Sequence, residues 1–389
     1  MLNAMFSQKL IFTKESDGAS YRVRLNPLFK PFITEVKIPA EHKGLPVRVI
    51  AKNAFMGAKK LKSISIPASI KYSCAAAFYG CDPESIHITD LKAWCDINFE
   101  WPTSNPTHCG ENLYLNGKIL ENIDFDGDVR SIGNYAFFGY EKLKSVSFFG
   151  VEIIGKEAFE GCGLSSVTLP QEVACINDGA FRRCSELTEA LILGGSDLIG
   201  DSIFSSCSSL KKATLGSNVK KIGAHTFSEC SKLTSVKMGD SVVEIGNYAF
   251  SKCSKLKNAK LPHALRTIGD SAFQECNALK EIELPNELQY IGKFAFDNSG
   301  IDSITIPHGV DSIQTATFQL CKKLEQVKIP RSVTRIEKSA FHLCDSLKTV
   351  NYAGTAEEWE KVSFPSGYPF KNSVRIYCYE SSYHGKNAE

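Results

Sequence analysis

Short stretches of alternating apolar and polar residues recur along the chain at nearly constant intervals. They share the pattern Leu-x-x-Val/Ile-x-Ile/Leu-Pro, as in Leu61–Pro67, Leu279–Pro285 and Leu324–Pro330. Alternation over so few positions predicts a short strand with one buried face. Proline cannot donate to a β ladder, so it marks the end of each strand. Equal spacing of many such strands indicates a repeat architecture.

A column of phenylalanines accompanies these strands. Successive members lie 22 or 23 residues apart, except for one gap of 59 residues between Phe78 and Phe137. The column holds twelve of the 24 phenylalanines in the chain, so chance does not explain it. Its members are Phe55, Phe78, Phe137, Phe159, Phe181, Phe204, Phe227, Phe250, Phe273, Phe296, Phe318 and Phe341.

Other residue types keep the same period. Alanine precedes the phenylalanine in nine of the twelve repeats, and isoleucine stands five residues before it in eleven. Cysteine stands three residues after it in nine repeats: Cys81, Cys162, Cys184, Cys207, Cys230, Cys253, Cys276, Cys321 and Cys344. The Ala-Phe-x-x-Cys segment suits a tight helical or 3₁₀ turn that points the ring inward.

These columns predict an α/β solenoid. It is a leucine-rich repeat array of about twelve repeats of 22–23 residues, each a short parallel strand plus a helical or 3₁₀ turn, with capping elements. A single repeat cannot bury its apolar face, whereas stacked repeats share one core. The expected core ladder consists of the phenylalanines from Phe137 to Phe341 and the cysteines from Cys162 to Cys344 in the two columns above.

The combined motif I-G-x-x-A-F-x-x-C-x-x-L-x-x-V-x-I-P resembles the BspA-type, or treponemal, class of leucine-rich repeats. The resemblance covers about residues 34–352. It implies a non-catalytic protein of the kind found at bacterial surfaces or secreted, where members are linked to adhesion and to binding of host proteins.

The breaks in the periodicity divide the chain into six parts. We expect an N-terminal hairpin cap at 1–33, first repeats at 34–88, an insertion with a short Trp-containing helix and a hairpin at 89–119, and ten repeats at 120–350. A C-terminal cap at 351–379 and a disordered tail at 380–389 follow. Asn116-Gly117 is a strong hairpin signal, and Thr355-Ala-Glu-Glu358 has the form of a capping box.

Fourteen cysteines would ordinarily suggest disulfides or a metal site. A small apolar thiol that fits the same slot in each repeat is the favoured interpretation, because stacked parallel side chains point the wrong way for a disulfide. Disulfides or metal remain the alternative. The redox state of the five cysteines outside the column is open: Cys74, Cys95, Cys109, Cys175 and Cys378.

Composition narrows the function. A net charge of +2 gives no reason to expect nucleic acid as a partner, and no apolar run reaches the roughly 18 residues of a membrane span. The sequence has no phosphate-binding loop and no H-E-x-x-H motif, and its eight histidines are scattered. We therefore expect no catalysis and no cofactor.

Two surface features are candidate sites. An aromatic cluster in one repeat, Tyr135, Phe138 and Phe149, suggests either a protein-binding site or packing on the insertion. A row of lysines beside the strand starts suggests either a solvated edge or a polyanion site: Lys211, Lys212, Lys232, Lys255, Lys257 and Lys280.

The predicted function is protein recognition by an extended surface of many modest contacts. The exposed strand positions that would carry it include Ser65, Thr168, Lys237, Lys260, Glu283, Thr305 and Lys328. By resemblance, the protein is a bacterial surface or secreted adhesion or host-interaction protein. The N-terminus, MLNAMFSQKLIF, does not have the form of a secretory signal, so an intracellular interaction scaffold in the cytoplasm is the alternative. Binding of an acidic glycan or another polyanion is a more remote one.

Overall fold

A computed structural model of the chain describes residues 8–193, 199–379 and 381–383. These residues form a β-solenoid of about 15 turns built from stacked parallel strands. This is more than the twelve repeats of the phenylalanine column, because the insertion and the caps contribute strands of their own. None of the described helices has the length and apolar character required to cross a membrane.

The chain divides into two compact units. Unit 1 comprises Met1–Val167 and Glu172–Ser185, and unit 2 comprises Thr168–Gln171 and Glu186–Glu389. The strand β16 (Ser166–Leu169) contains residues of both units.

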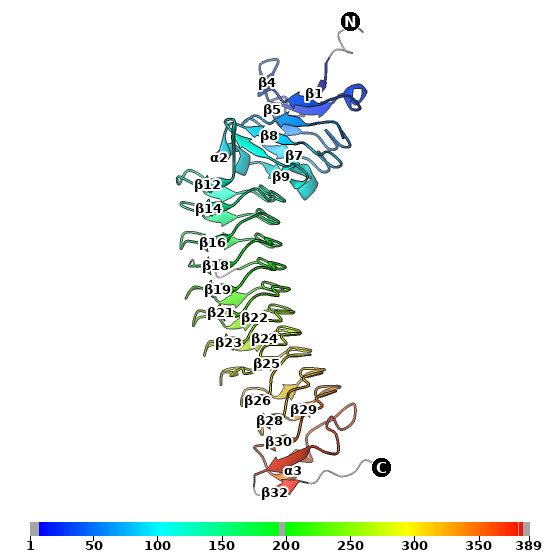
Figure 1. Ribbon diagram of the computed structural model, residues 1–389, viewed down its shortest axis with the longest axis vertical. Coiled ribbons are helices and arrows are strands. Elements are labelled where there is room, and N and C mark those ends of the chain that lie inside the picture. Colours follow the sequence, from blue (N-terminus) through cyan, green and yellow to red (C-terminus); the bar gives the residue numbers. More distant parts are fainter. Residues whose placement is uncertain (1–7, 194–198, 380, 384–389) are drawn as a thin grey trace. The chain divides into compact units, whose positions relative to one another are not determined.

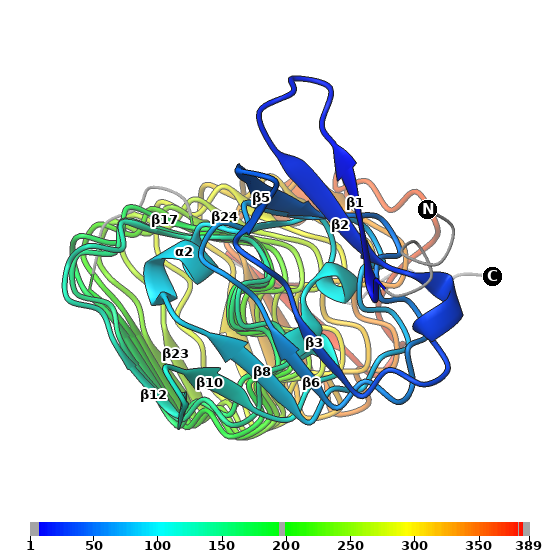
Figure 2. The ribbon, with the colours of Figure 1, turned by 90° about the horizontal axis from the view of Figure 1, so that it is seen from above.

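Unit 1 holds the N-terminal hairpin, the first repeats and the insertion. Its elements are β1 (Leu10–Lys14), β2 (Tyr21–Leu25), η1 (Pro27–Phe29), β3 (Glu35–Lys37), β4 (Glu41–His42), β5 (Leu45–Ile50), β6 (Ser63–Ser65), β7 (Tyr72–Ser73), β8 (Ser85–Ile88), α2 (Leu91–Cys95), β9 (Asn98–Phe99), η2 (Pro102–Ser104), η3 (Pro106–His108), β10 (Leu113–Leu115), β11 (Lys118–Ile119), β12 (Asn122–Asp124), β13 (Ser131–Ile132), β14 (Ser145–Ser147), β15 (Ile153–Ile154) and β17 (Cys175–Ile176). In Figure 2 the strands β3, β6, β8 and β10 lie side by side in one sheet.

The insertion is part of the stack. Strand β10 pairs in parallel with β8 and turns back through Asn116-Gly117 into β11. The helix α2 is capped by Asp90, and its Trp94 is 1% exposed and donates from Nε1 to the carbonyl of Ala136 at 2.9 Å. The segment therefore joins the first repeats to the later ones of unit 1 through buried contacts.

Unit 2 is the more regular of the two. Its elements are β18 (Glu189–Ile192), β19 (Lys212–Leu215), β20 (Lys221–Ile222), β21 (Ser235–Lys237), β22 (Glu244–Ile245), β23 (Asn258–Lys260), β24 (Thr267–Ile268), β25 (Tyr290–Ile291), β26 (Ser303–Thr305), β27 (Ser312–Ile313), β28 (Gln326–Ile329), β29 (Arg335–Ile336), β30 (Thr349–Tyr352), α3 (Ala356–Trp359), β31 (Arg375–Cys378) and β32 (Ser381–Tyr383). The longer strands of successive repeats stack in chain order, from β18 to β31 (Figure 1).

The C-terminal cap closes unit 2. Thr355 and Glu358 form a capping box at the start of α3, and Trp359 is buried. The ring of Phe370 stacks on Phe341 at 5.0 Å, which extends the phenylalanine column by one ring. Of the tail expected to be disordered, 380–389, the structure describes Ser381–Tyr383, which pair with β31 as β32; the rest lies outside the described residues.

The core of unit 2 is the phenylalanine column. The rings of Phe227, Phe250 and Phe273 stack with centroids 5.4 and 5.2 Å apart and planes 10° from parallel. Every ring from Phe204 to Phe318 is fully buried, at 0% exposure. This spacing follows from strands that lie about 4.8 Å apart in the stacking direction.

The turn that carries each phenylalanine does not have a helical backbone, so the α/β description is not confirmed. Residues two before and two after the ring have left-handed backbone, such as Tyr248 at φ 57° and Lys252 at φ 61°. A helix requires φ near −63° throughout, so a left-handed residue breaks it. The described α-helices are α2 and α3, both outside the regular repeats.

This turn geometry directs backbone amides at the next repeat. The amides of Tyr248, Phe250 and Lys252 donate to the carbonyls of Asp270, Ala272 and Gln274 at 2.8, 2.8 and 2.7 Å. In a helix the same amides would bond within their own segment. We call this set of bonds the turn ladder; it continues without a break from Ser202 to Leu320.

The cysteine column also bonds between repeats. The Sγ–H of Cys230 donates to the carbonyl of Phe204 at 3.1 Å, and Cys253 does the same to Phe227 at 3.1 Å. All fourteen cysteines are free thiols in the structure. Burial raises the pKa of Cys230 to about 12, so the thiol is neutral at physiological pH.

Candidate protein-binding face

The longer strands of unit 2 present one polar surface, which we call the strand face. In β21, β23 and β26 the central residue is buried and its two neighbours are exposed. Parallel register places Lys237 beside Lys260 in the adjacent strand. Five residues predicted for binding therefore lie exposed on this face: Lys237, Lys260, Glu283, Thr305 and Lys328.

The strand face is interrupted at Glu281–Leu284. This segment occupies the place of the next strand beside β23 and makes a single isolated bridge to it, between Asn258 and Glu281. Among the described residues, no backbone hydrogen bond involves the amides or carbonyls of Ile282, Glu283 and Leu284. Regular pairing resumes with β26 and β28.

The repeat that follows the interruption is one residue shorter. Two residues separate Cys276 from Leu279, whereas one residue, Gly300, separates Ser299 from Ile301. A Cβ on Gly300 would lie 2.2 Å from the carbonyl oxygen of Asn277, so only glycine fits there. The sequence signal for the interruption is the single residue between Ser299 and Ile301 in the 22-residue repeat from Phe296 to Phe318.

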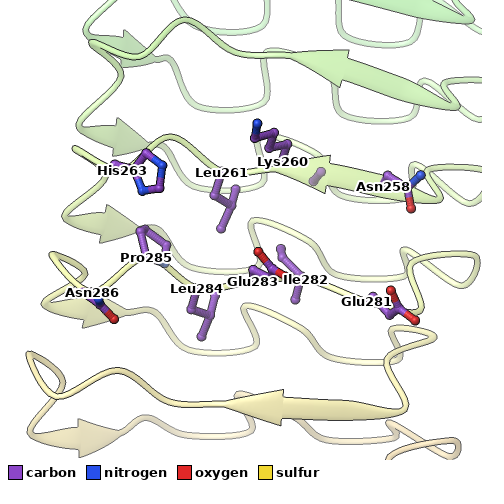
Figure 3. A pocket seen from close by; sticks show the side chains of 11 residues that line it. Asn258, Lys260, Leu261, His263, Glu281, Ile282, Glu283, Leu284, Pro285 and Asn286 are labelled. Carbon is purple, nitrogen blue, oxygen red and sulfur yellow. The ribbon is translucent and has the colours of Figure 1, made fainter.

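Three hollows follow one another across this part of the strand face. The first, of about 370 Å³, lies between β23 and the interrupted segment and is lined by Lys260, His263, Glu283 and Asn286, among others (Figure 3). The second, of about 460 Å³, lies between Glu281–Leu284 and Ser303–Thr305. The third, of about 250 Å³, begins at Thr305 and reaches Tyr352 in β30. Shared lining residues make them one shallow, continuous groove.

The chemistry of this groove is that of a contact surface. The lining of the first hollow combines the apolar Leu261 and Leu284 with the polar Lys260, Glu281 and Glu283. In the part of the chain that the structure describes, no group of three or more His, Cys, Asp or Glu side chains is placed to hold a metal ion. His263 and His308 line different hollows, consistent with their two-repeat separation.

The predicted aromatic cluster is divided in the structure. Tyr135 and Phe138 pack edge to face at 6.2 Å, and Tyr135 is 6% exposed. Asn105 of the insertion donates to the carbonyl of Tyr135 at 2.6 Å, so this pair packs on the insertion. Phe149 is 67% exposed and lies against Gly127 instead, where a Cβ would be 3.2 Å from the ring. A binding role for these residues stays a prediction.

The predicted lysine edge is exposed along unit 2. Thr234 links two of its members through the backbone, since it donates to the carbonyl of Lys211 and accepts from the amide of Lys257. Ion pairs between described residues include none of the six lysines: Lys211, Lys212, Lys232, Lys255, Lys257 and Lys280. Their use as a polyanion edge stays a prediction.

Comparison with known proteins supports the repeat assignment. The model of the BspA type leucine rich repeat region matches residues 30–148, 107–234, 192–276 and 243–369. No curated protein matches in sequence.

Solved structures with the same fold cover nearly the whole chain. A leucine rich cell surface protein from Faecalibacterium prausnitzii is 23% identical, with 93% of this chain and 98% of that one covered and a TM-score of 0.52. The pneumococcal vaccine antigen PcpA is 19% identical, with 96% and 98% covered and a TM-score of 0.59. At these identities the likeness establishes the fold.

Proposed function

Because the chain belongs to the BspA-type leucine-rich repeat family, we propose that it binds other proteins through the strand face of unit 2, without catalysis. The observation that carries the proposal is the continuous groove from β23 to β30. Shallow grooves lined by both apolar and polar side chains are typical of protein interfaces rather than of catalytic pockets.

We propose further that recognition takes place at the bacterial cell surface and that the partners include host proteins. The support is the resemblance to a protein described as a leucine rich cell surface protein and to a pneumococcal vaccine antigen. One observation favours a second candidate, an intracellular scaffold: all fourteen thiols are free, and thiols persist best in a reducing compartment. Cell fractionation with surface protease treatment separates the two candidates.

The test of protein binding compares two sets of substitutions. The face variant combines Thr305→Arg, Lys328→Glu and Asn351→Lys, all on the strand face. The control variant combines Arg266→Glu and Gln289→Lys. These exposed residues lie beside β24 and β25, which belong to a different sheet from the strand face. Binding to an array of purified extracellular matrix and host-surface proteins should be lost in the face variant and kept in the control. Equal binding by both variants would contradict the proposal.

A further inference from the structure

We infer that the interrupted segment Glu281–Leu284 is where an extended segment of the partner protein docks, and that this segment carries a lysine or arginine side chain. The inference rests on the proposed function, because it names the chemistry of the partner at the same face. It is carried by two separate observations: unpaired backbone groups on both sides of a hollow, and two unpaired carboxylates on its rim.

The first observation concerns the backbone. Ile282, Glu283 and Leu284 leave three amides and three carbonyls without a partner among the described residues. Across the second hollow, β26 pairs with β28 on one side, and its other edge has no partner strand in the described chain. Exposed strand edges are templates for another chain, because backbone polar groups need hydrogen bonds. An extended peptide supplies donors and acceptors at the required spacing.

The second observation concerns charge. Glu281 and Glu283 are both exposed and alternate along the segment, so their carboxylates point to the same side about 7 Å apart. Neither forms an ion pair with a described residue, whereas Glu325 on β28's side of the face is paired with Lys348 at 3.1 Å.

None of the residues that line the second hollow is basic, and Lys260 lines the first hollow instead. The lining of the second hollow is Glu281–Leu284 and Ser303–Thr305, which gives two carboxylates and two hydroxyls. All of these groups can accept hydrogen bonds from an ammonium or guanidinium group. Charge complementarity therefore selects a basic side chain in the occupant and disfavours an acidic one.

The experiment uses the full chain and three synthetic octapeptides. The probe is fluorescein-labelled Lys-Val-Lys-Val-Lys-Val-Lys-Val; the comparison peptides are its Glu-Val counterpart and a form with alternate backbone amides methylated. We expect the Lys-Val peptide to bind at least about tenfold more tightly than either comparison peptide, by fluorescence anisotropy. Hydrogen–deuterium exchange should show new protection at 281–284 and 303–305.

Two double variants locate the binding. Glu281→Gln with Glu283→Gln should weaken binding about tenfold. The matched control, Glu189→Gln with Glu287→Gln, removes two exposed carboxylates elsewhere in unit 2 and should leave binding unchanged. Equal binding by the methylated peptide, equal loss in both double variants, or protection confined to other strands would each overturn the inference.

The outcome separates this inference from the proposed function. A protein partner that is lost in the face variant but binds normally to the Glu281 and Glu283 double variant leaves the proposed function standing and rejects the inference. If the face variant still binds every partner, the proposed function itself is rejected.

Discussion

Unit 2 has two sides that are built from the same repeats but differ in continuity. On the turn side, each repeat from Ser202 to Leu320 gives three backbone amides to the next repeat, with no interruption. On the strand side, the ladder stops at β23 and resumes at β26. The phenylalanine rings and the cysteine thiols lie in the same segments as the turn ladder, so the uninterrupted side also holds the stacked rings and the thiol hydrogen bonds.

The difference indicates that the two sides have different roles. Stacking is maintained by the turn ladder and the aromatic column, which keep the same register from Ser202 to Leu320. The strand face contributes less to holding the repeats together. Three consecutive residues on it have no backbone hydrogen bonds, yet the phenylalanine column continues through Phe273, Phe296 and Phe318. Its exposed positions are therefore free to vary in polarity and charge.

The largest expected effect of this difference is on amide exchange. The amide of Phe250 belongs to the turn ladder, and that of Glu283 has no backbone partner. Opening free energies within one protein range from near zero to the global stability, so we expect Phe250 to exchange at least about a thousandfold more slowly. Hydrogen–deuterium exchange at single-residue resolution measures the ratio. Comparable rates would show that the interruption closes in solution.

The next effect is on stability. Phe250→Ala removes a fully buried ring from the column and should lower the free energy of unfolding by about 3–5 kcal/mol. The matched change on the strand face, Lys260→Ala, removes an exposed side chain and should cost no more than about 0.5 kcal/mol. Urea denaturation followed by circular dichroism gives both values. A similar cost for the two would remove the distinction between the sides.

A smaller effect appears in the dependence of stability on pH. Burial raises the pKa of Cys230 to about 12, whereas an unfolded thiol titrates near about 8.5. The folded state then holds a proton that the unfolded state loses. This contribution to stability is complete below about pH 8.5 and falls by about 1.4 kcal/mol per pH unit up to about pH 12.

Cys230→Ser tests this contribution, because Ser299 already occupies the same column. The variant should show a slope of unfolding free energy between pH 9 and pH 10.5 that is shallower by about 1.4 kcal/mol per pH unit, under reducing conditions. An unchanged slope would mean that the thiol is not held neutral by burial. The exposed lysines and tyrosines contribute equally to both proteins and cancel in the difference.

The smallest effect distinguishes the two backbone conformations. Lys252 has φ 61° in the turn, where glycine pays no steric cost, so Lys252→Gly should raise stability by about 0.5 kcal/mol. Lys260→Gly in strand β23 should instead lower it by about 0.5–1 kcal/mol. Thermal unfolding of the pair reports the two signs. Destabilisation by both changes would argue against the left-handed turn.

Much of this fold can be read from the sequence because periodic packing leaves periodic residues. The aromatic ring recurs at one position since each ring stacks on the next, and Cys230 and its equivalents recur since each thiol is buried and donates to a carbonyl of the neighbouring repeat. Local chemistry also marks the hairpin at Asn116-Gly117 and the helix start at Thr355. These features depend on single repeats or on their direct copies.

The turn geometry could not be read in the same way. Left-handed backbone positions are usually occupied by glycine or asparagine, but here they are occupied by residues such as His225, Tyr248 and Leu320. Their conformation is imposed by hydrogen bonds to the neighbouring repeat, not by their own preference.

The groove could not be predicted from the sequence for a related reason. It depends on how the segment Glu281–Leu284 aligns with the strand of the following, shorter repeat, and the sequence of a single repeat does not give that alignment. The aromatic cluster failed as a cluster because Phe149 follows a strand while Tyr135 and Phe138 lie in the turn on another side of the repeat.

The turn ladder has a consequence for how such a protein can change length. On the turn side, every repeat from Ser202 to Leu320 donates three backbone amides to carbonyls of the next repeat, so these repeats have equivalent neighbours there. Excising 227–249, which joins Thr226 directly to Phe250, removes one full period and leaves each remaining amide with an equivalent acceptor. Duplication does the reverse. Recombination within the gene can thus lengthen or shorten the recognition surface in whole steps, without a new solution to the packing problem each time.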